Sequence, residues 1–283
     1  MSGPEATLAT PAAARHNPNV VSLSLSRTVV ELKQFFRNPQ SAIFTFALPV
    51  GMLIIFSAIF SYKIDGPAGE SLSFRQYFVA GMVASGIMSS TFNSLAISIA
   101  TEQHEGLLKR LAGTPLPRSA YFAGKIGMGT VVAAIQTAIM LVIGLFFGLK
   151  LPVDPTRWAV FIGVLVLGVA TCSLLGIAYT RLIPNASSAP AIVTPAFIIL
   201  QFISGVFFTF DMIPTWMQGI ASLFPLRWMA LGLRYAFLPD WFKTQETGGS
   251  WNLPWVWGVL LIWLVIGFAA SLRFFRWDRS KGA

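Results

Sequence analysis

Six long apolar runs, almost free of charged residues, constrain the fold of this chain more than any other feature. A helix needs about 20 consecutive apolar residues to cross the hydrocarbon core of a bilayer. Each run is long enough to be one such helix, and an even number of crossings brings both termini to the same side. The predicted spans are residues 41–60, 76–100, 122–149, 158–181, 189–210 and 251–272.

The composition agrees with a membrane location. Of the 283 residues, 55% are hydrophobic and only 11% are charged, whereas soluble domains carry roughly 25% charge. A water-soluble fold could not cover so much apolar surface. We therefore predict an all-α polytopic membrane protein whose transmembrane domain covers residues 39–275. The net charge of +9 is then read by its position along the chain, so no nucleic-acid partner is expected.

The Lys and Arg residues are spread unevenly over the two sides of the predicted topology. Thirteen lie on the side of the termini and seven on the opposite side. Cytoplasmic segments carry the excess of Lys and Arg in membrane proteins. This bias predicts that both termini and the loop at 101–125 are cytoplasmic, in a protein of the plasma (inner) membrane surrounded by lipid.

The ends of the chain differ from the spans. Residues 1–19 are rich in Ala, Pro, Thr and Asn and are predicted to be a disordered tail, and residues 276–283 form a basic cytoplasmic tail. Residues 20–38 are predicted to form an amphipathic helix in the membrane interface. Its apolar residues recur at helical spacing: Val21, Leu25, Val29, Leu32 and Phe36.

The segment before the last span, residues 212–241, contains two apolar pieces of about 15 residues each, interrupted by prolines. They are too short to cross the membrane and are predicted to form a re-entrant pair of helices, an outer lid. Arg227 and Arg234 lie seven residues apart in the second piece. Because arginines facing lipid are costly, we expect them to face water or to pair with backbone carbonyls and nearby acids such as Asp211 or Asp240.

Several kinds of chemistry are missing from the predicted spans, which contain no His, Asp or Glu. Membrane enzymes need acid–base or metal-binding groups, and coupled carriers usually have a buried carboxylate. The chain also lacks a phosphate-binding G-x-x-x-x-G-K-[ST] loop. We expect no catalytic, cofactor or metal site in this chain. A polytopic enzyme of lipid metabolism and a secondary carrier remain the alternatives to a transport subunit driven by another protein.

Small and weakly polar residues gather in the second and fifth predicted spans. Such residues let helices approach closely and form hydrogen bonds between them. They can also line a path for an amphipathic, lipid-like cargo, and the sequence leaves both interpretations open. The candidate path residues are Ser85, Ser89 and Asn93 in the second span and Thr194, Gln201 and Ser204 in the fifth.

A dense polar insert, residues 101–125, separates the second and third spans. Its first part, 101–113, is predicted to be a cytoplasmic helix with leucines on one side, and Thr114-Pro115-Leu116-Pro117 ends it. A short, rigidly held helix suits docking into a groove on a soluble partner. From the charge pattern alone, a solvated loop helix remains an equal alternative.

The same insert resembles a known family signature. Glu105-x-x-Leu108-Lys109-Arg110-Leu111-x-x-Thr114-Pro115-Leu116-Pro117 is similar to the cytoplasmic signature of the ATP-binding-cassette type-2 exporter permeases, in particular those of the daunorubicin-resistance type. Arg37-Asn38-Pro39 and Ser204-Gly205-Val206-Phe207-Phe208 also resemble family motifs. The likeness extends over roughly residues 20–275. One departure is Gln103-His104, where the family commonly has a charged pair.

This resemblance implies a machine of several subunits. The chain would be the permease of an exporter that moves an amphipathic drug, lipid or glycoconjugate outward. It would pair with a second permease, identical or related, and each copy would rest on a separate ATPase subunit that holds ATP and Mg²⁺. The N-terminal interface helix and the 101–113 helix would be the contacts. The ATPase-coupling residues would be Glu102, Glu105, Gly106, Leu108, Lys109, Arg110, Leu111, Thr114 and Pro115.

Overall fold

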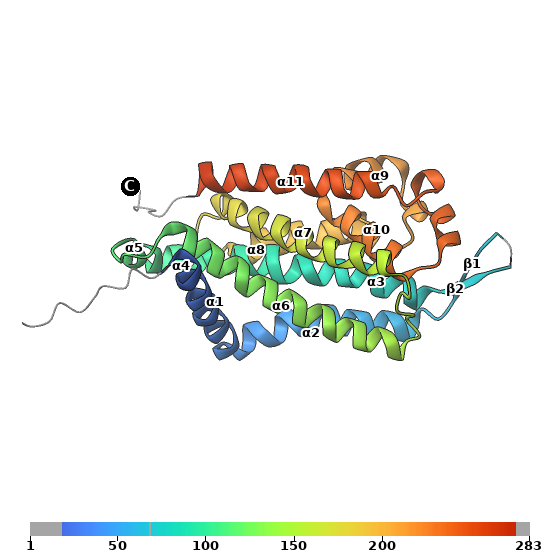
Figure 1. Cartoon of the computed structure of the whole chain (residues 1–283), viewed down its shortest axis with the longest axis horizontal. Helices are drawn as coiled ribbons and strands as arrows, with labels where there is room; N and C mark the ends of the chain where they lie inside the picture. Colours follow the sequence, from blue (N-terminus) through green and yellow to red (C-terminus); the bar gives the residue numbers. More distant parts are fainter. Residues whose placement is uncertain (1–18, 68, 276–283) are drawn as a thin grey trace, which may run out of the picture.

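The computed structural model describes residues 19–67 and 69–275, and this part of the chain is almost entirely helical (Figure 1). The predicted tails, 1–19 and 276–283, lie outside the described residues apart from Asn19. The α-helices are α1 (Val20–Arg37), α2 (Pro39–Ile59), α3 (Phe74–Met88), α4 (Ser94–His104), α5 (Leu107–Ala112), α6 (Arg118–Phe146), α7 (Pro155–Tyr179), α8 (Ala189–Ile203), α9 (Thr215–Ser222), α10 (Pro225–Phe237) and α11 (Leu253–Phe274).

Shorter elements connect these helices. Two strands, β1 (Lys63–Asp65) and β2 (Ser71–Ser73), form an antiparallel hairpin. A five-residue π-helical turn, η1 (Ser89–Asn93), joins α3 to α4 without a break. Four 3₁₀ helices complete the set: η2 (Thr180–Leu182), η3 (Phe210–Met212), η4 (Asp240–Gln245) and η5 (Thr247–Gly249).

The predicted all-α polytopic architecture is confirmed. Among the described residues, five helices are long and apolar enough to cross a membrane, and one apolar helix is shorter. The five are α2, the continuous α3–η1–α4 helix, α6, α7 with η2, and α11. The shorter helix is α8, in the place of the fifth predicted span.

Helix α8 ends at Ile203, seven residues before the predicted end of the fifth span. Its 15 residues rise about 22 Å, less than the roughly 30 Å of a hydrocarbon core. The helix stops because Gly205 adopts a left-handed conformation with φ of 71°, which turns the chain out of the helical path. The rest of the uncharged run continues as irregular chain up to η3.

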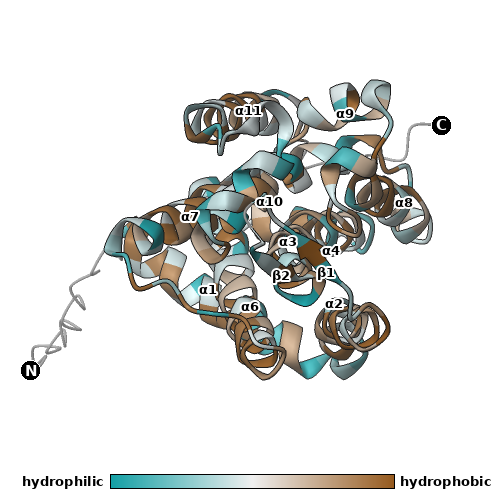
Figure 2. Cartoon of the chain, turned by 90° about the vertical axis from the view of Figure 1, so that its right-hand side faces the viewer, coloured by the Kyte–Doolittle hydropathy of each residue, from teal (hydrophilic) through white to brown (hydrophobic). Residues whose placement is uncertain are grey.

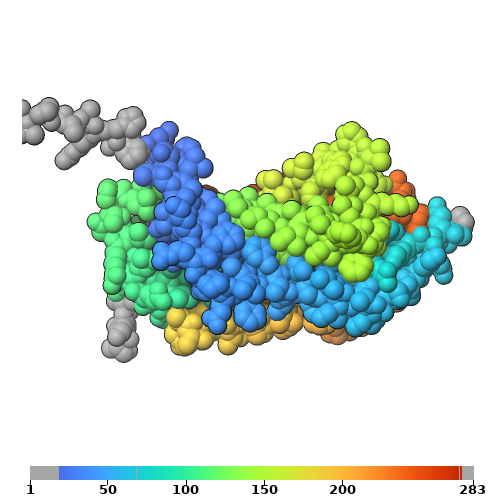
Figure 3. All heavy atoms as spheres, turned by 90° about the horizontal axis from the view of Figure 1, so that it is seen from below, coloured from blue at the N-terminus to red at the C-terminus, as the bar shows by residue number. Residues whose placement is uncertain are grey.

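The second predicted span lies at the centre of the bundle. In the α3–η1–α4 helix, 78% of the most apolar stretch is buried inside the protein, against 22% in α2 and in α11. Figure 2 shows α3 and α4 in the middle, with α2, α6, α7, α8 and α10 around them and hydrophobic residues on the surrounding helices. In Figure 3, α2 runs along one face of the molecule between α6 and α8.

The two ends of the bundle differ (Figure 1). At one end, here called the α5 end, α5 lies with α1 and the last residues of α11, so both ends of the described chain are on this side. The opposite end, the hairpin end, carries β1, β2, α9 and α10. The β-hairpin, whose strands have three residues each, was not predicted from the sequence.

The segment 212–241 forms two short helices, α9 and α10, and prolines bound both of them. Pro214 precedes α9, Pro225 is the first residue of α10, and Pro239 follows its end. Almost all of α10 is buried, and it packs against α3 and α7. The second of the predicted pieces is therefore part of the protein core at the hairpin end.

Candidate functional site

The polar insert folds as two helices rather than one. Helix α4 ends at His104 and α5 begins at Leu107. Between them Gly106 has φ of 74°, a left-handed conformation that favours glycine and ends an α-helix. The prediction of a single helix over 101–113 was wrong at this point. The break lets α5 leave the direction of α4 and extend from the end of the bundle.

The predicted coupling residues divide by exposure. The exposed residues are Glu105, Lys109, Arg110, Thr114 and Pro115, and the residues Gly106 and Leu111 are half-buried. Leu108 is fully buried and anchors α5 to the bundle. Glu102 is only 3% exposed, so it does not present its carboxylate to a soluble partner in this structure.

Glu102 instead belongs to a buried charge cluster at the α5 end, here called the lysine cluster. At its centre, the fully buried Lys125 of α6 donates hydrogen bonds to Glu31 of α1, at 2.7 Å, and to Glu102 of α4. The Lys125 ammonium also lies 3.2 Å from the Ser98 hydroxyl. One lysine therefore connects three separate helices.

Two further side chains complete the lysine cluster. The Tyr121 hydroxyl donates a 2.8 Å hydrogen bond to the second carboxylate oxygen of Glu102. The Arg27 guanidinium lies 2.5 Å from the other carboxylate oxygen of Glu31. With two cations and two carboxylates, the cluster is neutral. Buried charges are tolerated when they are paired in this way, and removing one partner costs about 3–5 kcal/mol.

Two glycines of α6 let α1 approach closely. A Cβ atom at Gly124 would lie 2.4 Å from the Arg27 side chain, and one at Gly127 would lie 2.4 Å from the Thr28 hydroxyl. The predicted apolar side of α1 faces outward, with Val21, Leu25 and Val29 about half or more exposed. The side that faces α6 carries Glu31, so the cluster and the glycines together hold α1 in place.

The pairing of Glu31 with Lys125 was not predicted from the sequence. They are 94 positions apart, and a lysine near the start of a span is ordinary in a cytoplasmic loop. A weak signal was present, because Glu31 is the only acid in α1 and Tyr121 and Lys125 are four residues apart on one face of α6.

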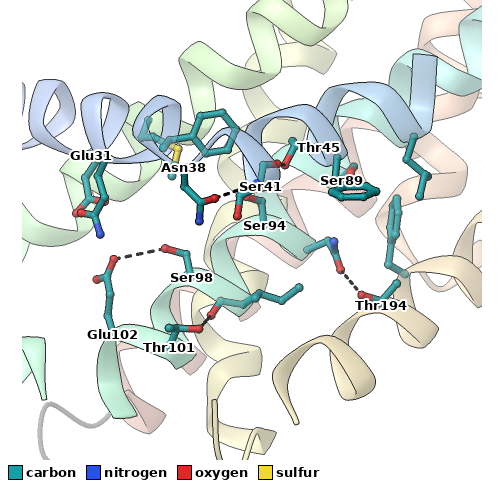
Figure 4. A pocket seen from close by; sticks show the side chains of 18 of the residues that line it. Glu31, Asn38, Ser41, Thr45, Ser89, Ser94, Ser98, Thr101, Glu102 and Thr194 are labelled. Carbon is teal, nitrogen blue, oxygen red and sulfur yellow. Dashed lines mark hydrogen bonds between the residues drawn. The ribbon is translucent and has the colours of Figure 1, made fainter. Parts of the chain in front are cut away.

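A cavity of about 520 Å³ lies beside the lysine cluster, between α1, α2, α4 and α8 (Figure 4). Polar side chains dominate its α4 wall, α2 contributes both polar and apolar side chains, and α8 contributes mainly apolar ones. The polar lining includes Asn38, Ser41, Thr45, Ser89, Asn93, Ser94, Ser98, Thr101 and Thr194. The apolar lining includes Phe44, Leu48, Ile97, Phe197 and Ile198. Volumes of 300–1,000 Å³ are typical of sites for drug-sized molecules.

The six predicted path residues separate into two groups. Ser89, Asn93 and Thr194 line the cavity, and the Thr194 hydroxyl donates to the Asn93 side chain at 3.3 Å. The other three, Ser85, Gln201 and Ser204, are buried outside it, where the Gln201 amide donates to the Ser85 hydroxyl. In this conformation the second group packs helices together, one of the two interpretations left open by the sequence.

The π-helical turn η1 forms part of the cavity wall, since it contains both Ser89 and Asn93. Hydroxyl groups satisfy backbone carbonyls around it: Ser90 donates to Gly86 at 3.0 Å and Thr91 donates to Ile87. Turns of this kind inside α-helices occur often at functional sites. Here the turn lies where the central helix passes the cavity.

A second buried charge cluster lies at the hairpin end, here called the arginine cluster. Glu246 accepts hydrogen bonds from Arg227 at 2.7 Å and from Arg234 at 3.0 Å. The Arg227 guanidinium also lies over the Phe210 ring, 3.7 Å from its centre, and that of Arg234 over the Tyr77 ring at 4.1 Å. Both aromatic faces favour the cations.

The arginine cluster satisfies the backbone where α8 is broken. Arg234 donates to the Gly205 carbonyl, and the Tyr77 hydroxyl lies 2.8 Å from the carbonyl oxygens of both Gly205 and Phe208. Irregular backbone is tolerated at membrane depth only where protein or water satisfies its polar groups. These contacts explain how the chain after α8 can leave the helix.

The expected pairing with a backbone carbonyl is confirmed for Arg234, which donates to Gly205, but the two acids named as partners of the arginines were wrong. Asp240 pairs with Arg157 at 2.7 Å, and the carboxylate that receives both arginines is Glu246. Arg227 and Arg234 are 3% and 0% exposed, so neither faces open water. Burial alone would raise the pKa of Glu246, but the two guanidinium groups outweigh it and hold that pKa below its ordinary value of 4.5.

Comparison with known proteins identifies the family. The family model described as ABC-2 type transporter matches residues 26–238, which include Arg227, Arg234 and all residues that line the cavity. The chain belongs to the ABC-2 type transporter family. It is therefore a multi-pass membrane transporter, as the resemblance in the polar insert implied.

The curated relatives of this ABC-2 chain are named as permeases. It is 25% identical over 241 residues to the inner membrane transport permease YadH of Escherichia coli K12, covering 82% of this chain and 88% of the relative. It is also 25% identical to the putative transport permease ycf38 of Cyanophora paradoxa, covering 75% and 72%. The putative transport permease YvfS of Bacillus subtilis is 18% identical, covering 70% and 79%. The family is one of transport subunits rather than enzymes.

Proposed function

We propose that this chain is the membrane-spanning subunit of an ATP-driven exporter, and that a separate ATPase subunit docks on the α5 end. The cargo would be an amphipathic drug, lipid or glycoconjugate that occupies the cavity between α2, α4 and α8 before it moves outward. Two permease copies, identical or related, would form the complete membrane unit, as the family resemblance implies. ATP and Mg²⁺ would be held by the ATPase.

The observation that carries this proposal is the continuity between α5 and the cavity wall. The exposed α5 follows α4 after a single glycine turn, and α4 provides Ser94, Ser98 and Thr101 to the cavity. Through Glu102, the same helix is tied to α1 and α6 by the lysine cluster. A force applied to α5 would therefore move the cavity wall and α1 together.

The orientation follows from the charge bias in the sequence. The α5 end carries the larger share of Lys and Arg, which favours the cytoplasmic side. In this orientation the arginine cluster, α9 and α10 would lie toward the outside. The break after α8 would then be part of the exit, with Arg227 and Arg234 holding its closed form.

Docking is tested by reversing one charge on α5. Arg110→Glu should lose co-purification with the partner ATPase subunit and should lose cargo-stimulated ATP hydrolysis, because like charges across a docking surface repel. The matched control is Arg273→Glu, an exposed arginine on α11 at the same end. If Arg110→Glu retained both properties at the wild-type level, docking through α5 would be wrong.

Orientation is tested with two matched threonines. Thr114 follows α5 and Thr244 lies in η4, and both are exposed. Each is changed to cysteine in a Cys172→Ala background and treated with a membrane-impermeant maleimide in intact cells. We expect labelling at position 244 and none at 114 until the membrane is permeabilised. The reverse pattern would place the α5 end outside.

A further inference from the structure

The cavity beside the lysine cluster has an asymmetric charge. Three of the side chains that line it are carboxylates, Glu31, Glu102 and Glu105, and none of its described lining residues is a lysine, arginine or histidine. The cations that neutralise Glu31 and Glu102 are Lys125 of α6 and Arg27, which is one turn before Glu31 on the side of α1 that faces α6, and neither lines the cavity. Lys125 and Arg27 are therefore behind the wall, not inside the cavity.

Glu105 gives the cavity a net negative charge. Glu31 and Glu102 are balanced by Arg27 and Lys125 within the neutral lysine cluster. Glu105 is exposed where the cavity meets the α5 end, and it makes no ion pair with any residue that the structure describes. A positive group entering beside it would gain attraction, whereas an anion would be repelled and would lose its hydration in the apolar part of the cavity.

The charged groups lie at one end of the cavity, and uncharged groups line the rest of it. Figure 4 shows Glu31 and Glu102 at one end and Ser89 and Thr194 at the other. Phe197 and Leu48 also line it, so an apolar body has partners there. The volume of about 520 Å³ suits one drug-sized molecule rather than a long polymer.

We propose that the cavity selects cationic amphiphiles of drug size, with the positive group beside Glu105 and the apolar body against α2 and α8. This inference rests on the proposed function, because it assumes that the cavity is the cargo site. It narrows the cargo by charge and size, which the family membership leaves open.

A pair of probes with the same shape and opposite charge tests the proposal. Tetraphenylphosphonium and tetraphenylborate are each titrated by equilibrium dialysis against the full-length chain in detergent micelles, with empty micelles subtracted. We expect saturable binding of the cation and none of the anion. Glu105→Gln should weaken cation binding about fivefold to tenfold, as expected for one nearby charge that is partly exposed to solvent.

Two further variants keep the outcomes distinct. Glu70→Gln changes an exposed carboxylate at the hairpin end and should leave cation binding unchanged. Ser94→Trp fills the cavity and should abolish cation binding. An unfolding temperature equal to that of the wild type shows that this variant is still folded. If the anion bound as tightly as the cation, or if Glu105→Gln bound the cation normally, charge selection would be wrong although the cavity still bound cargo. Cation binding unaffected by Ser94→Trp, or no binding of either probe, would overturn the cavity as the cargo site as well.

Discussion

The two buried charge clusters are opposite in composition. At the α5 end a cation, Lys125, lies between two carboxylates, and at the hairpin end a carboxylate, Glu246, lies between two guanidinium groups. The lysine cluster joins residues 94 and 23 positions apart on three helices. In the arginine cluster the partners are only 19 and 12 positions apart.

The difference assigns separate tasks to the two clusters. The lysine cluster holds together elements that are distant in sequence and adjoin the cavity, so it can transmit a movement of α4 to α1 and α6. The arginine cluster joins α10 to the loop that follows it, and its spare hydrogen-bonding capacity goes to the broken backbone after α8. The first cluster connects helices, and the second stabilises an interruption in one.

The largest effect is expected from removing the central lysine. Lys125→Met leaves Glu31 and Glu102 buried with one cation fewer, and it should reduce the free energy of unfolding by about 3–5 kcal/mol. The measurement is the unfolding transition of the purified chain in detergent. Lys33→Met, an exposed lysine on α1, is the control. Equal stability of the two variants would show that the lysine cluster does not hold the three helices together.

A smaller loss is expected at the other cluster. Glu246→Gln should reduce the free energy of unfolding by about 2–3 kcal/mol. The loss is smaller because Arg227 and Arg234 keep their contacts with the Phe210 and Tyr77 rings, and Arg234 keeps its hydrogen bond to the Gly205 carbonyl. The control is Asp240→Asn, whose side chain is 70% exposed and which should cost less than about 1 kcal/mol. If Glu246→Gln reduced the free energy of unfolding more than Lys125→Met did, the arginine cluster would contribute more stability than the lysine cluster, contrary to this prediction.

The close contact of α1 gives a third test. Gly127→Val places side-chain atoms where Thr28 lies, so α1 must shift. The shift should reduce the free energy of unfolding by about 1–3 kcal/mol. Gly51→Val in α2 is the matched control, because a Cβ there meets nothing within 4 Å. Limited proteolysis in the α1 region, compared between the variants, reports whether the helix has moved. Identical protection in both would mean that the α1 contact does not depend on this glycine.

The smallest effect concerns acid. Because the folded-state pKa of Glu246 is held below 4.5, its carboxylate contributes stability that is complete above that ordinary value and is lost as the pH falls through the lower folded value. The unfolding temperatures of the wild type and of Glu246→Gln should therefore differ at pH 7, and the difference should shrink as the pH falls below 4.5. A difference that stayed constant over this range would contradict the assigned pairing.

The sequence predicted the number and order of the apolar elements well, since each depends on a local run of residues. It could not predict where α8 ends. The chain after Ser204 remains uncharged, and composition does not distinguish a helix from irregular backbone whose carbonyls are satisfied elsewhere. The groups that satisfy Gly205 are Tyr77, 128 positions away, and Arg234, 29 positions away.

The candidate site was predicted only in part for a similar reason. Exposed residues of α5 could be recognised from a continuous motif. Glu102 belongs to the same motif but points toward Lys125, and this depends on how α4 and α6 pack. The cavity likewise combines Asn93 with residues of α2, such as Ser41 and Thr45, that have no motif in the sequence.

The π-helical turn η1 determines the directions in which the side chains of α4, the continuation of the central helix, point. One additional residue turns the following side chains by about 100° relative to an uninterrupted α-helix. Ser94 and Ser98 face the cavity, and Glu102 faces Lys125. These orientations depend on the additional residue that the π-helical segment between 89 and 93 contains. Loss of one residue there would leave the span almost as long and as apolar, yet α4 would present a different side to the cavity, to α1 and to α6.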